Sequence, residues 1–143
     1  MSTVESILDY ASRFRAAIEN ALYTNPCPLD SALFTFPRGM CTITSDLLGM
    51  YLNKHGIAVQ SIRSGNSNNN HEWLVTYDGI HIDITCDQFT GYNQKVFVSN
   101  SLDDFHKKMF KPFIYEEFKP PYPDSCIYNI SMKRLSTIEK YIE

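Results

Sequence analysis

Apolar residues recur at helical spacing in the first part of the chain. Between residues 3 and 22 they predict an amphipathic helix. A second helix is predicted from Cys41 to His55, because apolar positions again follow helical spacing and Gly56 supplies the left-handed residue that commonly ends a helix. Residues 23–40 are rich in proline and predict an irregular connection between these helices.

Strand-like segments occupy the middle of the chain. A short strand is expected after Val59, a polar loop over residues 64–70, and two strands within residues 71–85. Asp78-Gly79 lies between those two strands and is a strong hairpin signal. A further strand is expected over residues 95–99.

The last third of the chain carries weaker signals. Residues 102–110 are amphipathic, and residues 130–142 predict a closing helix. We assign no helix or strand to the aromatic, proline-rich stretch 111–126. The pattern as a whole predicts an α+β fold in a single domain over residues 1–143, large enough to bury a core without a disulfide or metal.

The turn of the predicted hairpin decides which side chains can meet. A two-residue turn of Asp78 and Gly79 would put His71 and Asp83 on opposite faces of the sheet. A three-residue turn with Gly79 in the left-handed region would make them diagonal neighbours on one face, roughly 7–8 Å apart. We favour this second register because it places Leu74 on the isoleucine face of the next strand. The expected pairs are then Thr76 with Ile80, Trp73 with Asp83, and His71 with Thr85.

Composition and charge limit the expected partners. The chain has 13 Lys and Arg against 16 Asp and Glu, a net charge of -3, and no basic block, so we expect no nucleic-acid partner. Residues 1–15 do not form a secretory signal and no later stretch is apolar enough to span a membrane. We expect a protein that is cytoplasmic as synthesised, with no membrane partner; secretion by a route that needs no signal peptide stays open.

The cysteines are widely spaced and include no CxxC pair, which argues against a zinc ribbon and against a disulfide scaffold. Each thiol is therefore judged by its own surroundings. We expect no metal and no cofactor, and we interpret Cys27 and Cys126 as spectators.

Cys41 stands where the second helix is predicted to begin. The positive end of a helix and a nearby imidazolium both lower the pKa of a thiol, and the thiolate is the nucleophile. His71 supplies an imidazole, and Asp83 supplies a carboxylate that could fix the tautomer of that imidazole. The three residues in this order predict a Cys–His–Asp triad.

This arrangement resembles the transglutaminase-like branch of the papain-like cysteine hydrolases, over residues 36 to 90. The matching pieces are Gly39-Met40-Cys41 opening a helix that ends in Gly56-Ile57, then His71-x-Trp73 on one strand and Asp83-Ile84-Thr85 on the next. The resemblance implies N-terminal helices packed on an antiparallel sheet. It also implies that Cys41 is the nucleophile, His71 the general base and acid, and Asp83 its orienting partner.

Three further residues are expected to bind substrate: Arg38, Trp73 and Gln88. Trp73 is expected to form a wall beside the triad. The backbone N–H of Cys41 is the natural first oxyanion donor, and Gln88, Asn25 or another backbone group could be the second.

The predicted function is that of a cysteine hydrolase that acts on amide bonds of a protein or peptide through a thioester, as a glutamine deamidase or a protease. By the resemblance, small standalone domains of this kind often act as bacterial effectors or toxins. An acyl or amine transferase and a non-catalytic interaction domain of the same fold are the alternatives. Calcium-dependent cross-linking is disfavoured because the chain has no acidic calcium loop.

Each candidate residue also has a plainer interpretation. Cys41 could be a small buried hydrophobe, His71 an exposed residue at a strand start, and Asp83 a surface charge. His81 shares the predicted face and could replace His71 as the base. Cys86 could bind zinc with Cys41 and His71, although no paired-ligand spacing supports it.

Overall fold

Helix α1 (Val4–Tyr23) follows the apolar spacing of its sequence in the computed structural model, which describes residues 3–143. Thr3 caps the helix: its hydroxyl accepts the backbone N–H of Ser6, and the Ser6 hydroxyl accepts the backbone N–H of Thr3. The apolar side of the helix is fully buried in the first core, which confirms the predicted amphipathic helix.

Helix α2 (Cys41–Lys54) confirms the second predicted helix. It begins at the predicted cysteine and ends one residue early, with His55 as the C-cap and Gly56 in the left-handed region at φ +81°. The connection from α1 contains only a short 3-10 turn, η1 (Ser31–Leu33), within an otherwise irregular stretch.

Five antiparallel strands form one sheet within the described residues, in the order β4-β3-β2-β1-β5. Their bounds are β1 (Val59–Ser64), β2 (Glu72–Thr76), β3 (His81–Asp83), β4 (Phe97–Ser99) and β5 (Phe113–Glu117). Together with helices α1 and α2, α3 (Asp104–Phe110) and α4 (Cys126–Glu139), they give an α+β fold over residues 3–143.

Strand β5 corrects the sequence analysis, which assigned no strand to residues 111–126. It pairs with β1, Ile62 opposite Tyr115, and forms an edge of the sheet. Its side chains are half-buried or exposed on both faces, so the alternation that reveals a strand in sequence is missing. Helix α4 also starts four residues before the predicted 130, because Ser125 caps it by accepting the N–H of Tyr128.

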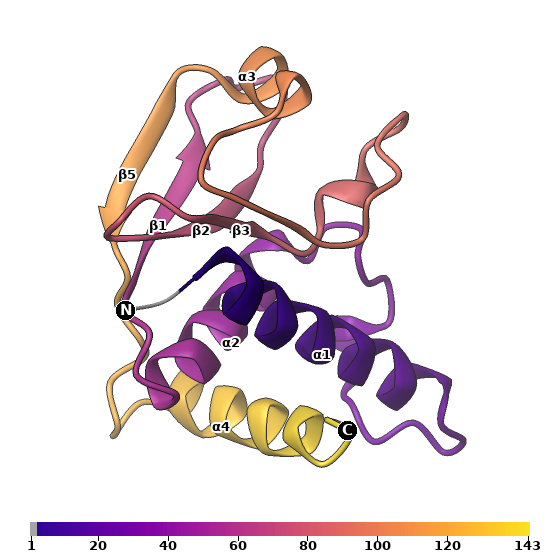
Figure 1. The fold of residues 1–143 in the computed structure, drawn as a ribbon. Helices are drawn as coiled ribbons and strands as arrows, with labels where there is room; N and C mark the ends of the chain where they lie inside the picture. The colour runs from indigo at the N-terminus through magenta and orange to yellow at the C-terminus, as the bar shows by residue number, and fades with distance from the viewer. Residues whose placement is uncertain (1–2) are drawn as a thin grey trace.

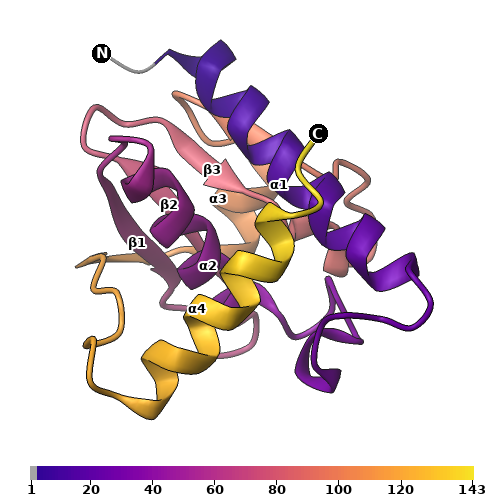
Figure 2. The same cartoon turned by 90° about the horizontal axis from the view of Figure 1, so that it is seen from below.

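The sheet has helices on both faces. Helices α1 and α2 pack on one face, and α4 packs against those two helices rather than against the sheet (Figures 1 and 2). On the other face, Phe110 of α3 closes a second core over the central strands. This second core consists of Ile62, Trp73, Val75, Cys86 and Phe110.

The hairpin has the three-residue register that we favoured. Leu74 pairs with Ile82, and the N–H of Thr76 donates to the carbonyl of Ile80 at 2.9 Å. Gly79 has φ +92°, a backbone conformation that disfavours any residue with a Cβ. Leu74 and the isoleucines therefore enter the first core, and Asp83 faces the second.

Within residues 3–143 we find no helix with the length and apolar character that a bilayer crossing requires.

Arg15 is a buried charge that ties α1 to the segment after β3. Its guanidinium donates to both carboxylate oxygens of Asp87, at 2.7 and 2.8 Å, and to the carbonyls of Ile84 and Lys95. The Phe36 ring covers it, 4.7 Å from the guanidinium carbon. These contacts compensate a charge that is costly to bury alone.

Replacing Arg15 with Gln should lower the free energy of unfolding by about 3 kcal/mol, because the partly buried Asp87 carboxylate would lose its cation. Arg13→Gln is the matched control: Arg13 lies on the same helix, its pair with Asp9 is half exposed, and the loss should stay below about 1 kcal/mol. Urea unfolding followed by circular dichroism measures both changes. Equal losses in the two variants would contradict the anchoring role of Arg15.

Candidate active site

Cys41 is the first residue of α2 and is partly exposed, so it is not the buried hydrophobe of the plainer interpretation. Gly39, at φ +70°, leads the chain into the helix, and its N–H donates to Oε1 of Gln88 at 3.0 Å. The thiol thus lies at the positive end of the helix dipole, where a thiolate is favoured.

His71 and Asp83 meet as a buried hydrogen-bonded pair. Nε2 of His71 lies 2.7 Å from Oδ2 of Asp83, and both side chains are fully buried. The other carboxylate oxygen, Oδ1, accepts the backbone N–H of Thr85 at 3.0 Å. His71 is therefore not an exposed strand-start residue, and Asp83 is not a surface charge.

The thiol of Cys41 and the imidazole of His71 shift each other's pKa. Burial raises the pKa of the Cys41 thiol, but the hydrogen bond and charge of His71 outweigh burial, with a smaller contribution from the backbone N–H of Glu72, so the net pKa is lowered. Burial lowers the pKa of His71, whereas Asp83 and then Cys41 raise it, and the net pKa is about 9. A thiolate–imidazolium pair is the state that these shifts favour.

The carboxylate of Asp83 stays ionised in this network. Burial raises its pKa, but the charge of His71 and hydrogen bonds from His106 and His71 outweigh burial and hold the pKa well below its usual range. An ionised Asp83 can only accept hydrogen bonds, so it fixes Nε2–H of His71 and leaves Nδ1 of that ring available to the thiol.

The three predicted substrate-binding residues lie in different surroundings. Gln88 ends the 3-10 turn η2 (Cys86–Gln88), and its side-chain nitrogen lies 3.4 Å from Nδ1 of His71. Arg38 is exposed on the segment that precedes Cys41. Trp73 is fully buried beside His71, with 5.6 Å between the two ring centroids.

His81, the alternative base, is occupied elsewhere. Its Nδ1 accepts the indole N–H of Trp73 at 3.1 Å. Burial lowers the pKa of His81 to about 4, with a further contribution from the charge of His106, so the ring is neutral near pH 7. His71 is the histidine that interacts with Cys41.

The sequence analysis missed a second histidine in the site. Nε2 of His106, on α3, lies 2.7 Å from the same Oδ2 of Asp83 that binds His71, and its Nδ1 lies 2.6 Å from Oδ1 of Asp103. The hydroxyl of Tyr92 donates to Oδ2 of Asp103 at 2.8 Å. The sequence carries one local signal: Asp103 stands three residues before His106 as a helix N-cap. Nothing local indicates that this helix reaches Asp83.

The side chains that could hold a metal ion are His71, Asp83, Cys86 and His106, whose potential ligand atoms lie within 4.8 Å of one another. This set differs from the predicted one because it lacks Cys41. Both histidine nitrogens lie at hydrogen-bond distance, 2.7 Å, from one carboxylate oxygen, whereas ligand atoms on one tetrahedral zinc ion lie about 3.3 Å apart. Burial, then the charge of Asp83, raises the pKa of Cys86, so its thiol is protonated within this network. We interpret the cluster as a hydrogen-bonded network.

Two partly buried carboxylates, Asp46 on α2 and Glu72 after His71, interact with each other. Burial raises the pKa of Asp46 to about 6. Burial, then the charge of Asp46, raises the pKa of Glu72 to about 7.

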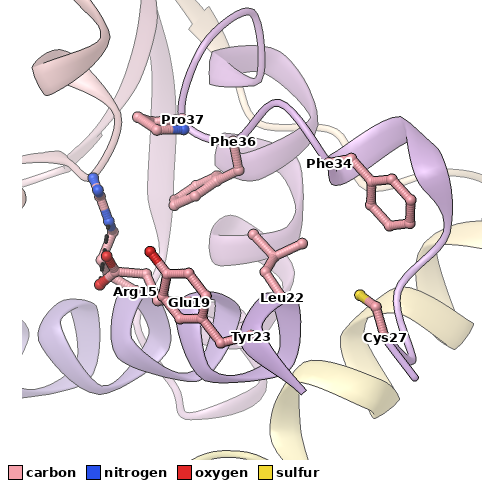
Figure 3. Close-up of a pocket in the computed structure, with 8 residues that line it drawn as sticks. All are labelled: Arg15, Glu19, Leu22, Tyr23, Cys27, Phe34, Phe36 and Pro37. Atoms are coloured by element: carbon pink, nitrogen blue, oxygen red, sulfur yellow. Dashed lines mark ion pairs between the residues drawn. The ribbon is translucent and has the colours of Figure 1, made fainter. Parts of the chain in front are cut away.

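A pocket of about 510 Å³ lies between the C-terminal half of α1 and the segment that leads to Cys41 (Figure 3). Arg15 and Glu19 line it on the helix side, and Phe34 and Phe36 on the other. Cys41, His71 and Asp83 do not line this pocket. The pocket is therefore separate from the candidate site residues.

Comparison of the chain with models of protein families, with curated proteins and with solved structures found no match.

The thiol of Cys41 should be alkylated by iodoacetamide at pH 6, faster than the exposed Cys126, because its lowered pKa leaves more thiolate. His71→Ala should slow this reaction about tenfold or more, and His55→Ala, at an exposed position at the end of α2, should not. Peptide mapping by mass spectrometry identifies the modified cysteine. Equal labelling of all four cysteines, or labelling only after denaturation, would contradict an activated nucleophile.

Proposed function

We propose that this chain is a cysteine hydrolase of papain-like, transglutaminase-like fold, which attacks amide bonds of a protein or peptide through a thioester on Cys41. The observation that supports it is the buried hydrogen bond between His71 and Asp83, together with a partly exposed Cys41 at the start of α2 whose pKa His71 lowers. Nucleophile, base and orienting carboxylate follow in the order that the chemistry needs.

The first half of the reaction forms the thioester. His71 takes the thiol proton, and the thiolate sulfur of Cys41 attacks the amide carbon to give a tetrahedral oxyanion. The imidazolium then gives that proton to the amide nitrogen, the carbon–nitrogen bond breaks, and ammonia or an amine leaves.

The second half releases the product. Water attacks the thioester carbon while His71 takes its proton, the carbon–sulfur bond breaks, and the proton returns to the sulfur. The products are a carboxylic acid and the free thiol. An amine in place of water would give transfer instead of hydrolysis, with the same bonds to sulfur formed and broken.

Two groups are placed to stabilise the oxyanion. The backbone N–H of Cys41, at the start of a helix, lacks an intrahelical partner. The side-chain nitrogen of Gln88 lies beside His71, while its Oε1 is held by the N–H of Gly39. We infer that Gln88, rather than Asn25, is the second donor.

Gln88→Ala should lower the rate of thioester formation by about 10²–10³-fold, the usual loss when one oxyanion donor is removed. Alkylation of Cys41 by iodoacetamide forms no oxyanion, so its rate should change only a few-fold and serves as the internal control. Equal falls in both rates would show that Gln88 merely supports the loop before Cys41.

The substrate decides between deamidation, proteolysis and transfer. By the resemblance, a glutamine side chain on a host or competitor protein is one specific substrate, as expected of a bacterial effector or toxin. A protease would cut a backbone amide, and a transferase would join two molecules.

Mass spectrometry of candidate proteins incubated with the wild type and with Cys41→Ala separates these outcomes. A gain of about one dalton at glutamine means deamidation, new termini mean proteolysis, and larger adducts mean transfer, all absent with the variant. A wild type that binds a partner but leaves it and model thioesters unchanged would favour the alternative, a non-catalytic interaction domain.

A further inference from the structure

The Asp83 carboxylate is shared by two histidines. Nε2 of His71 and Nε2 of His106 both lie 2.7 Å from Oδ2 of Asp83, and all three side chains are fully buried. His106 also contacts Asp103, through Nδ1 and through its backbone N–H, which donates to Oδ1 at 2.9 Å. A chain of alternating imidazoles and carboxylates therefore runs from His71 through Asp83 and His106 to Asp103.

The hydrogen bonds determine where the protons lie. An ionised carboxylate only accepts hydrogen bonds, and each ring nitrogen of His106 faces a carboxylate oxygen, one from Asp83 and one from Asp103. Both contacts are satisfied when the ring carries a proton on each nitrogen. His106 is then a buried imidazolium between two carboxylates, which compensate its charge.

The neighbouring groups support this assignment. Burial raises the pKa of Asp103, but hydrogen bonds from His106 and Tyr92 outweigh burial and lower it, so Asp103 is ionised near pH 7. Asp83 is also ionised, so neither carboxylate holds the proton that the ring needs.

We propose that His106, held as an imidazolium by Asp103, is a positioning residue of the proposed hydrolase: it fixes the Asp83 carboxylate and offsets part of its charge. This inference rests on the proposed function. His71 then faces a carboxylate whose negative charge is shared, and its own proton is easier to give to the leaving amine. With all of that charge facing His71, the imidazolium would be a weaker general acid.

The ionisable groups that surround this pair of histidines come from every element packed on them. They are Cys41 of α2, Glu72 of β2, His81 and Asp83 of β3, Cys86 of η2, and Tyr92 and Asp103 from the segment before α3. Near pH 7, His81 and Cys86 are neutral, because burial opposes the charged form of each. The charges nearest to His71 are thus those of Asp83 and Cys41, and Asp83 connects it to His106.

Two different substitutions should change His71 in the same direction. His106→Gln keeps a donor for Asp83 but removes the positive charge, and Asp103→Asn keeps the helix cap but removes the carboxylate that holds that charge. The measurement is the rate at which iodoacetamide alkylates Cys41, recorded between pH 4 and 10.5. This curve should have an inflection where His71 loses its proton, near pH 9 in the wild type, and in both variants the inflection should move up by about one pH unit.

A matched control separates charge from packing. His55→Gln makes the same substitution at an exposed histidine, and its inflection should coincide with that of the wild type. If His106 only fills space, both network variants would lower the melting temperature and leave the inflection within about 0.3 pH units of the wild type. That result in folded variants overturns the proposal.

A measurement on the unmodified protein keeps the proposal testable if the variants do not fold. Long-range ¹H–¹⁵N spectra at pH 7 should show His106 with both ring nitrogens protonated, and a neutral ring overturns the assignment. One zinc ion per chain that resists chelation and is lost in His106→Gln would also overturn it, because the nitrogens would then be metal ligands.

The same experiments distinguish failure of this inference from failure of the proposed function. A wild-type Cys41 no more reactive than Cys126 rejects the hydrolase itself. A reactive Cys41 whose pH profile ignores His106 and Asp103 rejects only the positioning role.

Discussion

A carboxylate that is completely buried must be surrounded by hydrogen-bond donors, and Asp83 meets this requirement with three. They are Nε2 of His71 at the start of β2, Nε2 of His106 on α3, and the N–H of Thr85 after β3. Because the donors come from separate elements, the hairpin, the turn after β3 and α3 must all be in place before the charge is compensated. The buried network and the second core therefore form together, because the face of the sheet that holds Asp83 is closed by α3, the helix that carries His106.

Much of this site follows from local signals. Gly79 allows a three-residue turn, and that turn places Leu74 on the same face as the isoleucines around β3. Because side chains alternate along a strand, His71 and Asp83 then share the other face of the sheet. The position of Cys41 at the start of α2 is also predicted from the local sequence, because the apolar spacing gives the helix and Gly56 marks its end. His71 and Asp83 are hydrogen-bonded on one face, as this register implies, while the Cys–His–Asp triad, its catalytic role and the papain-like assignment remain proposals.

The rest depends on contacts that no local pattern encodes. Strand β5 is stabilised by its pairing with β1. Its side chains are half-buried or exposed and do not alternate, so its sequence does not indicate a strand. His106 lies on a seven-residue helix and is separated by 23 residues from its carboxylate partner Asp83. A short amphipathic segment can be recognised in the sequence, but the direction in which it faces is set by packing against Trp73 and Phe97.

Helix α1 contributes none of the candidate site residues, but hydrogen bonds connect it to the start of α2. Arg15 donates to Asp87, and the next residue, Gln88, accepts the N–H of Gly39, two residues before Cys41. The guanidinium that anchors the first helix therefore also supports the segment through which the chain enters the second.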